Sequence, residues 1–416
     1  VSLAWAINLE NFTGGDRSSL ITNNTITAGT GVSNTTTAIK LTSPTDVTTI
    51  ENNTITTGDG GNYAYGIRLW RYKQAAVRDN TITGVTNTGR TYLLNIGDSS
   101  GNTTSTEVSN NRFELAGAGS VGSYGLRLIN HTGGPVTISG NEFVGANTTD
   151  TAPEYRLAEI RDTTSDIVFD SNLLEGIAGS NSEALRVWDA ANSPVISNNV
   201  IYRRNGGATS FTAINIEPAG GDRTSVNAPV IDNNTIVYQN SASDDFIGIR
   251  LEGSSAEDIQ PIIRNNLIAN ISGSAIGSGV YQQTTTATQG ESAPERFQNN
   301  AFYDVGTLWN FSDAGMTDLT TIADINDEAN TTLGTTGDGT ADGNVDVDTD
   351  ADSMNFNDPS DSNSDASDDF ELTASSPTSI TAGGLDLSSD ADNALTDDYS
   401  GTTRTAPFSI GAYEQD

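Results

Sequence analysis

The chain has 416 residues, with 54 acidic residues against 19 basic ones, for a formal net charge of −35. This charge would repel nucleic acid and anionic membranes, so we expect neither as a partner. A solvated acidic surface, a saline environment or bound divalent cations would each account for it. Cysteine is absent, which excludes disulfides and thiol chemistry.

The abundance of Thr, Asn, Ser, Asp and Gly is typical of extracellular β-rich proteins, so we expect a secreted or cell-surface location. The sequence begins at Val1 rather than Met, which indicates a processed or trimmed chain whose signal peptide is already gone. No apolar run approaches the roughly 20 residues of a transmembrane helix, so we expect no membrane insertion.

The chain starts directly on a strand-like segment, residues 3–9, with no amphipathic helix ahead of it. An uncovered strand at the end of a sheet exposes unpaired backbone donors and acceptors, which form a template for another chain. A loop, or residues outside this sequence, would cover the strand equally well. Self-association through this end and simple coverage of it therefore both stay open.

A six-residue pattern, apolar-x-x-Asn-x-apolar, occurs ten times between residues 21 and 302. Successive asparagines are separated by 27 residues (Asn53 to Asn80) to 35 residues (Asn199 to Asn234), a loose period that indicates stacked repeats. The ten asparagines are Asn24, Asn53, Asn80, Asn111, Asn141, Asn172, Asn199, Asn234, Asn266 and Asn300.

Asparagine suits a tight bend between two short strands, because it tolerates the left-handed conformation and hydrogen-bonds its own backbone. The apolar residues on either side of it then point into a core. Where the repeats stack, the asparagines lie above one another and their amides can bond along the column.

An apolar-x-apolar strand upstream of the motifs forms a second column. Period-two alternation points its two apolar residues inward and its central residue outward. The outward residues are Asn8, Lys40, Arg68, Asn95, Arg127, Glu159, Arg186, Asn215 and Arg250.

Together these patterns resemble the right-handed parallel β-helix family, which includes the pectate-lyase-like proteins. The resemblance covers residues 1–305. It implies an all-β solenoid, a right-handed parallel β-helix of about ten or more coils with an asparagine ladder, followed by an acidic module. We therefore expect a β-helix domain over residues 1–305 and an acidic, loop-rich capping or extension module over residues 306–416.

The C-terminal part carries a resemblance of its own. Residues 337–369 form an acidic low-complexity stretch, and a further series of short motifs follows. The series is similar to the C-terminal module of secreted bacterial β-helix proteins, which commonly closes the C-terminal side of the helix. Two departures are the replacement of the usual Ala-Ile-Asp by residues 378–381 and of the last Asp by Ser409. The motifs are Asp369-Phe-Glu-Leu372, Ser376-Pro377, Ala382-Gly-Gly384, Asp398-Tyr-Ser-Gly401, Arg404 and Ile410-Gly-Ala-Tyr-Glu414.

The outward column and its neighbours form a candidate carbohydrate-binding stripe. Aromatic rings stack on sugar faces, and arginine pairs with carboxylate or sulfate groups. A ladder of polar side chains that satisfy one another across the strands explains the same residues, and we favour it. The stripe consists of Tyr65, Arg68, Trp70, Tyr124, Arg127, Arg186 and Trp188.

An enzyme of this fold would need a catalytic set. The single histidine, His131, lies in a sequence that resembles a turn rather than a polygalacturonase motif. Some uronate lyases of this fold use a lysine base beside an arginine, with a metal that neutralises the substrate carboxylate. Lys40 and Arg68, one coil apart, have these residue types, although no metal partners are evident in the sequence. Stacked polar residues are the simpler interpretation.

Four alternating aspartates, Asp346, Asp348, Asp350 and Asp352, form a candidate calcium site. In an extended chain their carboxylates share one face, and calcium accepts oxygen ligands in flexible geometry. A solvated acidic loop is the competing interpretation.

The sequence thus predicts a non-enzymatic extracellular structural or adhesive protein, a subunit that assembles into filaments or a surface array through its coil ends. The alternatives are a polysaccharide lyase that uses Lys40 and Arg68, and a passive carbohydrate-binding module.

Overall fold

The computed structural model describes residues 3–10, 17–30, 34–99, 105–115, 121–145, 154–176, 182–190, 192–203, 210–217, 229–239, 246–253, 261–272, 276–283, 294–312, 317–327, 340–347, 354, 356–358 and 369–415. These residues form two compact units: the first comprises Val1–Val168, Asn172–Asn192 and Arg203–Ala219, and the second Phe169–Ser171, Ser193–Tyr202 and Gly220–Asp416. Both are parallel β-solenoids. The helices of the described residues are α1 (Ile322–Asn326) and α2 (Thr378–Thr381), both in the second unit.

The strands up to residue 190 are β1 (Leu3–Glu10), β2 (Arg17–Thr22), β3 (Thr25–Thr27), β4 (Thr35–Glu51), β5 (Thr54–Thr56), β6 (Tyr63–Arg78), β7 (Thr81–Thr83), β8 (Arg90–Ser99), β9 (Thr106–Ser109), β10 (Arg112–Glu114), β11 (Gly122–His131), β12 (Val136–Ser139), β13 (Glu142–Val144), β14 (Tyr155–Thr163), β15 (Ile167–Asp170), β16 (Leu173–Glu175) and β17 (Ser182–Ala190). The later strands are β18 (Val195–Ser197), β19 (Val200–Arg203), β20 (Phe211–Glu217), β21 (Val230–Asp232), β22 (Thr235–Tyr238), β23 (Phe246–Glu252), β24 (Ile262–Arg264), β25 (Leu267–Asn270), β26 (Ile276–Gln283), β27 (Arg296–Gln298), β28 (Ala301–Tyr303), β29 (Val305–Phe311), β30 (Thr340–Asp342), β31 (Val345–Asp346), β32 (Phe356–Asp358) and β33 (Asp369–Leu372).

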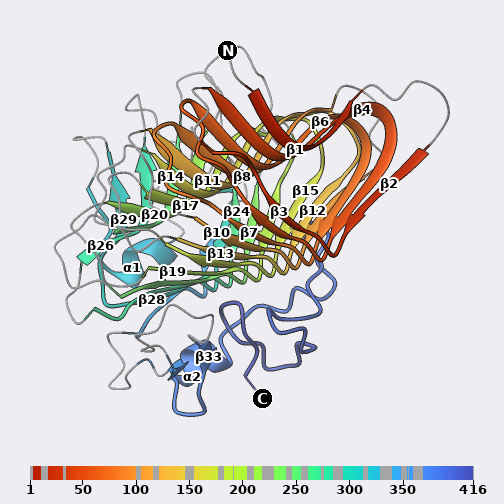
Figure 1. Ribbon diagram of the computed structural model, residues 1–416. Helices are drawn as coiled ribbons and strands as arrows, with labels where there is room; N and C mark the ends of the chain where they lie inside the picture. The colour runs from red at the N-terminus through yellow and green to blue at the C-terminus, as the bar shows by residue number, and fades with distance from the viewer. Residues whose placement is uncertain are drawn as a thin grey trace. The chain divides into compact units, whose positions relative to one another are not determined.

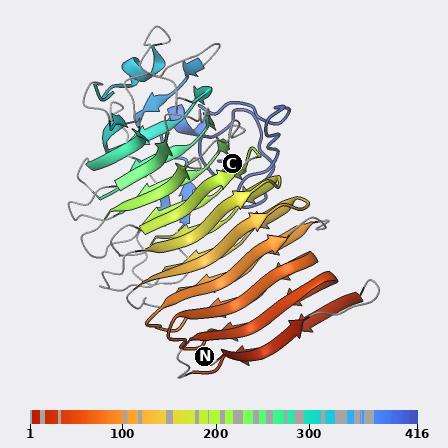
Figure 2. The same cartoon turned by 90° about the horizontal axis from the view of Figure 1, so that it is seen from above.

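In the first unit, each repeat places its strands directly on those of the previous repeat. One parallel series runs β1, β4, β6, β8, β11, β14, β17 and β20. Another consists of the three-residue strands β3, β5, β7, β10, β13 and β16. Figures 1 and 2 show these strands as stacked, parallel ribbons in the red to yellow part of the chain.

The second unit repeats this arrangement. Its parallel series are β18, β21, β24, β27 and β30; β22, β25, β28 and β31; and β23, β26 and β29. Parallel pairing thus continues beyond residue 305, through β30 and β31. The strands β32 and β33 form a separate antiparallel pair.

The core consists of the apolar columns that the sequence predicts. Ile39, Ile67, Leu94 and Leu126 follow one another in register on successive strands, and none is exposed. On the three-residue strands, Phe113 stacks on the next repeat's phenylalanine, with ring centroids 4.8 Å apart. A repeat cannot bury these side chains alone, so stacking supplies the apolar burial that stabilises the solenoid.

The bend beside each ladder asparagine is made by the preceding residue. Asn23, Asn52 and Asn110 have φ values of 57°, 55° and 54°, in the left-handed region, and Gly140 has a φ of 63°. The prediction that the ladder asparagine itself adopts this conformation is wrong. The ladder side chain has to point along the stack, and its neighbour therefore makes the bend.

The asparagine ladder is confirmed. In the first unit, the backbone N and the side-chain Nδ2 of Asn53 both donate to Oδ1 of Asn80, each at 3.0 Å. The same pair of bonds links Asn80 to Asn111, and Asn111 to Asn141.

In the second unit the ladder runs through Asn199, Asn234, Asn266 and Asn300, and continues to Asn344. Asn344 is not among the ten asparagines that the sequence pattern predicts. It lies 44 residues after Asn300, and Ala341 and Asp346 stand where the pattern expects large apolar residues.

Candidate functional site

The predicted outward column is assembled in the first unit, because the strands pair in the expected register. Lys40 lies opposite Arg68, which lies opposite Asn95, and Asn95 lies opposite Arg127. Glu159 follows, and then Arg186 and Asn215. Residues from distant parts of the sequence therefore form one polar surface.

Most charges on this surface pair with each other. Arg127 Nε lies 3.2 Å from a carboxylate oxygen of Glu159, and Arg156 lies 2.7 Å from Glu159 and 2.6 Å from Glu183. Burial alone would lower the pKa of Arg156, but Glu183 and Glu159 raise it above its ordinary value. Arg186 is paired with Glu217. This pairing favours the interpretation of a self-satisfied polar ladder.

Tyr65 and Tyr124, the two tyrosines of the predicted stripe, are buried. They stack along the strands on Tyr92, which was not predicted, with centroids 5.2 and 4.8 Å from its ring. All three are less than 9% exposed, and burial raises the pKa of Tyr65 to about 12. We expected exposed rings at Tyr65 and Tyr124. The rings cover one another because the residues occupy the same position on adjacent strands.

The two tryptophans of the stripe are partly exposed and contact arginines. Trp188 contacts Arg161 and Arg186, whose guanidinium carbons are 3.6 and 4.9 Å from its ring centroid. Trp70 lies 5.3 Å from the guanidinium of Arg68. These are the aromatic faces of the candidate stripe that solvent reaches.

Lys40 and Arg68 are neighbours, as the sequence predicted, but their environments differ. The amine of Lys40 is ion-paired with Glu10 and lies 5.2 Å from the ring centroid of Trp5. The hydrogen bond from Lys40 lowers the pKa of Glu10. Arg68 contacts the rings of Tyr65 and Trp70 and has no carboxylate partner among the residues that the structure describes.

His131 is the last residue of β11 and is fully buried, so the expectation of a turn at this position is wrong. Its Nδ1 lies 2.6 Å from Ser165 Oγ, and its Nε2 lies 3.4 Å from Thr106 Oγ1. Burial lowers the pKa of His131 to about 4, so the ring is neutral at pH 7. The ring therefore links the hydroxyl groups of Ser165 and Thr106.

Of the predicted calcium ligands, Asp346 lies on β31 and is partly exposed. Asp348, Asp350 and Asp352 lie outside the described residues. Within the described ranges, no group of three or more His, Cys, Asp or Glu side chains could hold a metal ion.

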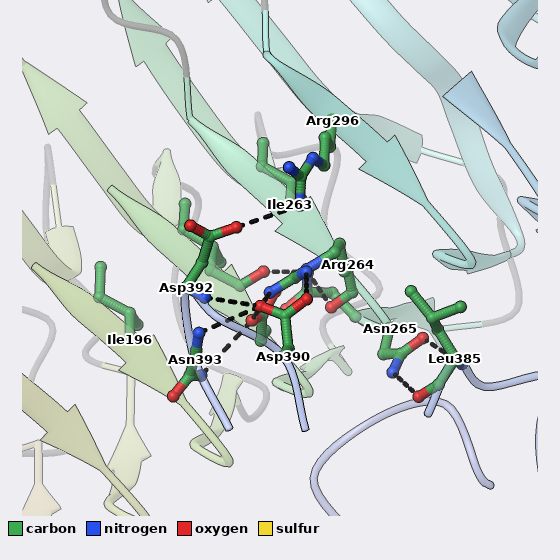
Figure 3. Close-up of polar contacts among 12 residues, drawn as sticks. Ile196, Ile263, Arg264, Asn265, Arg296, Leu385, Asp390, Asp392 and Asn393 are labelled. Carbon is green, nitrogen blue, oxygen red and sulfur yellow. Dashed lines mark hydrogen bonds and ion pairs between the residues drawn. The ribbon is translucent and has the colours of Figure 1, made fainter. Parts of the chain in front are cut away.

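A polar cluster in the second unit was not anticipated from the sequence. Arg264 is buried between two carboxylates: it donates to Asp232 at 3.1 and 2.7 Å, and to Asp390 at 2.8 and 3.1 Å (Figure 3). Burial raises the pKa of Asp232 to about 6, against the lowering effect of Arg264. Asn265 pairs with both the N–H and the carbonyl of Leu385, at 2.8 and 2.9 Å. These contacts hold residues 385–393 against the bends of the solenoid.

The arginine and glutamate of the C-terminal motifs meet. Arg404 and Glu414 are both buried, and their side chains are 3.1 Å apart. Arg404 also donates to Oδ1 of Asn198 at 3.1 Å and to the carbonyl of Gly411 at 2.9 Å. Because Asn198 belongs to a bend of the solenoid, this arginine fixes the last residues of the chain to it.

No protein-family model, no curated protein and no solved structure matches this chain. The class of the protein therefore follows from its fold, which is a parallel β-solenoid with an asparagine ladder. Among the residues that the structure describes, no helix has the length and apolar character needed to cross a membrane.

Proposed function

We propose that the chain is a non-enzymatic structural or adhesive protein, located outside the cell or on its surface, that associates with itself through a coil end. The observation that carries this proposal is the surface formed by β1 and β2. Both strands pair with β4 on one side, and no described residue pairs with their other edge. Open strand edges of this kind readily pair with another chain.

Apolar exposure at the same end supports the proposal. Leu3 is 50% exposed, Trp5 41% and Leu20 63%. They make up three of the six large apolar side chains exposed among the described residues. Grouped exposed apolar side chains beside an open edge are typical of an interaction surface.

The experiment compares the wild-type chain with Leu20→Lys by sedimentation velocity over a range of concentrations. A charge at this edge should reduce association, because it disfavours edge-to-edge pairing. Val168→Lys is the matched control, since Val168 is 37% exposed on β15, which is not an end strand. A wild-type chain that remains monomeric at every concentration would refute the proposed association.

Several finer features belong to this proposal. They are the right-handed winding, the division near residue 305 and the acidic C-terminal module. Calcium binding at residues 346–352 is supported by the alternation of the aspartates, and a calcium titration followed by calorimetry tests it.

Passive carbohydrate binding is the second candidate, and the half-exposed Trp70 and Trp188 beside arginines favour it. Trp70→Ala combined with Trp188→Ala should weaken binding on a glycan panel, and unchanged binding would exclude this stripe. The lyase alternative has less support, because the amine of Lys40, its proposed base, is engaged by Glu10. If the wild type forms an unsaturated product from a uronan and Lys40→Ala does not, the lyase alternative is supported.

A further inference from the structure

The asparagine ladder has a direction. At each interior step of the first unit, the N and Nδ2 of one asparagine donate to Oδ1 of the asparagine in the following repeat, as from Asn80 to Asn111. Within the ladder, every interior residue therefore accepts at Oδ1 from the preceding asparagine and donates to Oδ1 of the following one. Its Nδ2 also donates to a backbone carbonyl of the preceding repeat, as from Asn111 to Val77. The two ends of such a ladder differ chemically: one presents an acceptor, and the other presents donors.

Among the described residues, the acceptor end of the first unit has no partner. Asn24 donates its N and Nδ2 to Oδ1 of Asn53, at 3.0 and 3.1 Å. Within the described part of the chain, nothing donates to Oδ1 of Asn24, and its side chain is exposed. The open edges of β1 and β2 belong to the same end.

At the donor end of the second unit, one residue takes the place of the asparagine that a further repeat would supply. Asn344 donates its N and Nδ2 to Oδ1 of Asn326, at 3.2 and 2.8 Å. Asn326 is the last residue of α1, so a helix supplies the acceptor that a following coil would otherwise supply.

The residues just before α1 cover the adjacent strand edge. Leu319 and Trp309 form an antiparallel bridge, with N–O distances of 2.9 and 3.0 Å between their backbones. A carboxylate oxygen of Asp318 also accepts the backbone N–H of Phe311 at 2.9 Å. Residues 317–327, which we call the end cap, therefore satisfy both the ladder and the β29 edge at the donor end.

We infer that the acceptor end of one copy is a docking surface for the donor end of a second copy, and that the end cap competes with this contact. The inference rests on the proposed self-association, and it adds the polarity of the contact and the element that controls it. A contact between two acceptor ends would place two Oδ1 atoms of Asn24 together without a donor. A head-to-tail contact instead joins Oδ1 of Asn24 to the N and Nδ2 of Asn344, once Asn326 is displaced. A contact between unlike ends is heterologous, so its repetition links copies into a ring or an open filament, whereas a contact between two like ends gives a closed dimer.

Substitutions at Asn326 and Asn24 test the inference by sedimentation velocity. Asn326→Ala removes the acceptor from the cap while alanine keeps the helix favourable, so the donor end opens. We expect the concentration needed for association to fall by about tenfold or more, since the three hydrogen bonds between the Asn326 side chain and Asn344 no longer hold the cap in place. Asn326→Asp keeps acceptor oxygens for Asn344 but loses the hydrogen bond that Nδ2 donates to the carbonyl of Asn344 at 2.9 Å, so its effect should be smaller than that of Asn326→Ala. The double variant Asn326→Ala, Asn24→Ala should lose the stronger association that Asn326→Ala shows.

Circular dichroism establishes that each variant retains its β structure before its association is compared. The inference is overturned if Asn326→Ala associates no more strongly than Asn326→Asp, or if Asn24→Ala leaves the association of Asn326→Ala unchanged. If association of the wild type depends on Leu20 but on neither asparagine, the proposed function stands and the inferred contact between Asn24 and Asn344 is refuted. If every variant is monomeric, both the proposed function and this contact are refuted.

Discussion

Removal of one interior ladder side chain should destabilise the solenoid by an amount that can be worked from its hydrogen bonds. The side chain of Asn111 donates to the carbonyls of Val77 and Ser109 and to Oδ1 of Asn141, at 2.8, 3.0 and 3.0 Å. Its own oxygen accepts two hydrogen bonds from Asn80, at 3.0 and 2.9 Å.

Asn111→Ala removes these five contacts in a buried position. Because Nδ2 carries only two hydrogens, its three contacts amount to two full hydrogen bonds, so four bonds in all are lost. At about 1 kcal/mol each, we expect a loss of about 4 kcal/mol in the free energy of unfolding. Asn24→Ala is the matched control, because Asn24 occupies the same motif position at an exposed end. At this exposed position, water replaces the two hydrogen bonds that the side chain of Asn24 donates, so the loss in the free energy of unfolding should stay below about 1 kcal/mol.

The assay is urea unfolding followed by circular dichroism, together with hydrogen exchange of the backbone amides of Asn80 and Asn111. Exchange at these amides should accelerate in Asn111→Ala and stay near the wild-type rate in Asn24→Ala. Equal stability losses in the two variants would refute the reasoning, because the ladder would then contribute no more in the interior than at its open end.

Three further predictions concern stability and assembly. The pKa of His131 is lowered from 6.5 to about 4, so its contribution to stability is complete above pH 6.5 and is lost as the pH falls toward 4. The loss amounts to about 3 kcal/mol, and His131→Gln should remove this pH dependence of the urea midpoint. Arg404→Ala leaves Glu414 buried without its partner, so hydrogen exchange in residues 398–415 should accelerate, in line with a local cost of about 3 kcal/mol or more. Leu20→Lys should lower association while Val168→Lys leaves it unchanged.

The sequence was sufficient to predict the solenoid, because its fold depends on short patterns that recur. The apolar-x-apolar strands set the register, so the order of Lys40, Arg68, Asn95 and Arg127 on one surface followed from the sequence alone. The ladder was predictable for the same reason, since the same residue type returns at the same position in each repeat.

Features that depend on contacts without a repeat were not predictable. Arg264 and Asp390 are 126 residues apart in the sequence, and nothing local to either residue indicates their pairing. Asn344 was missed because its neighbours depart from the apolar pattern. Tyr65 was placed correctly on its strand, but its burial depends on how closely the rings of adjacent repeats stack.

Electron microscopy of the purified chain, with calcium and with a chelator, tests the central claim most directly. The proposed function predicts filaments or ordered arrays, and these should be reduced by Leu20→Lys. Separate single particles under both conditions would contradict self-association through the coil end.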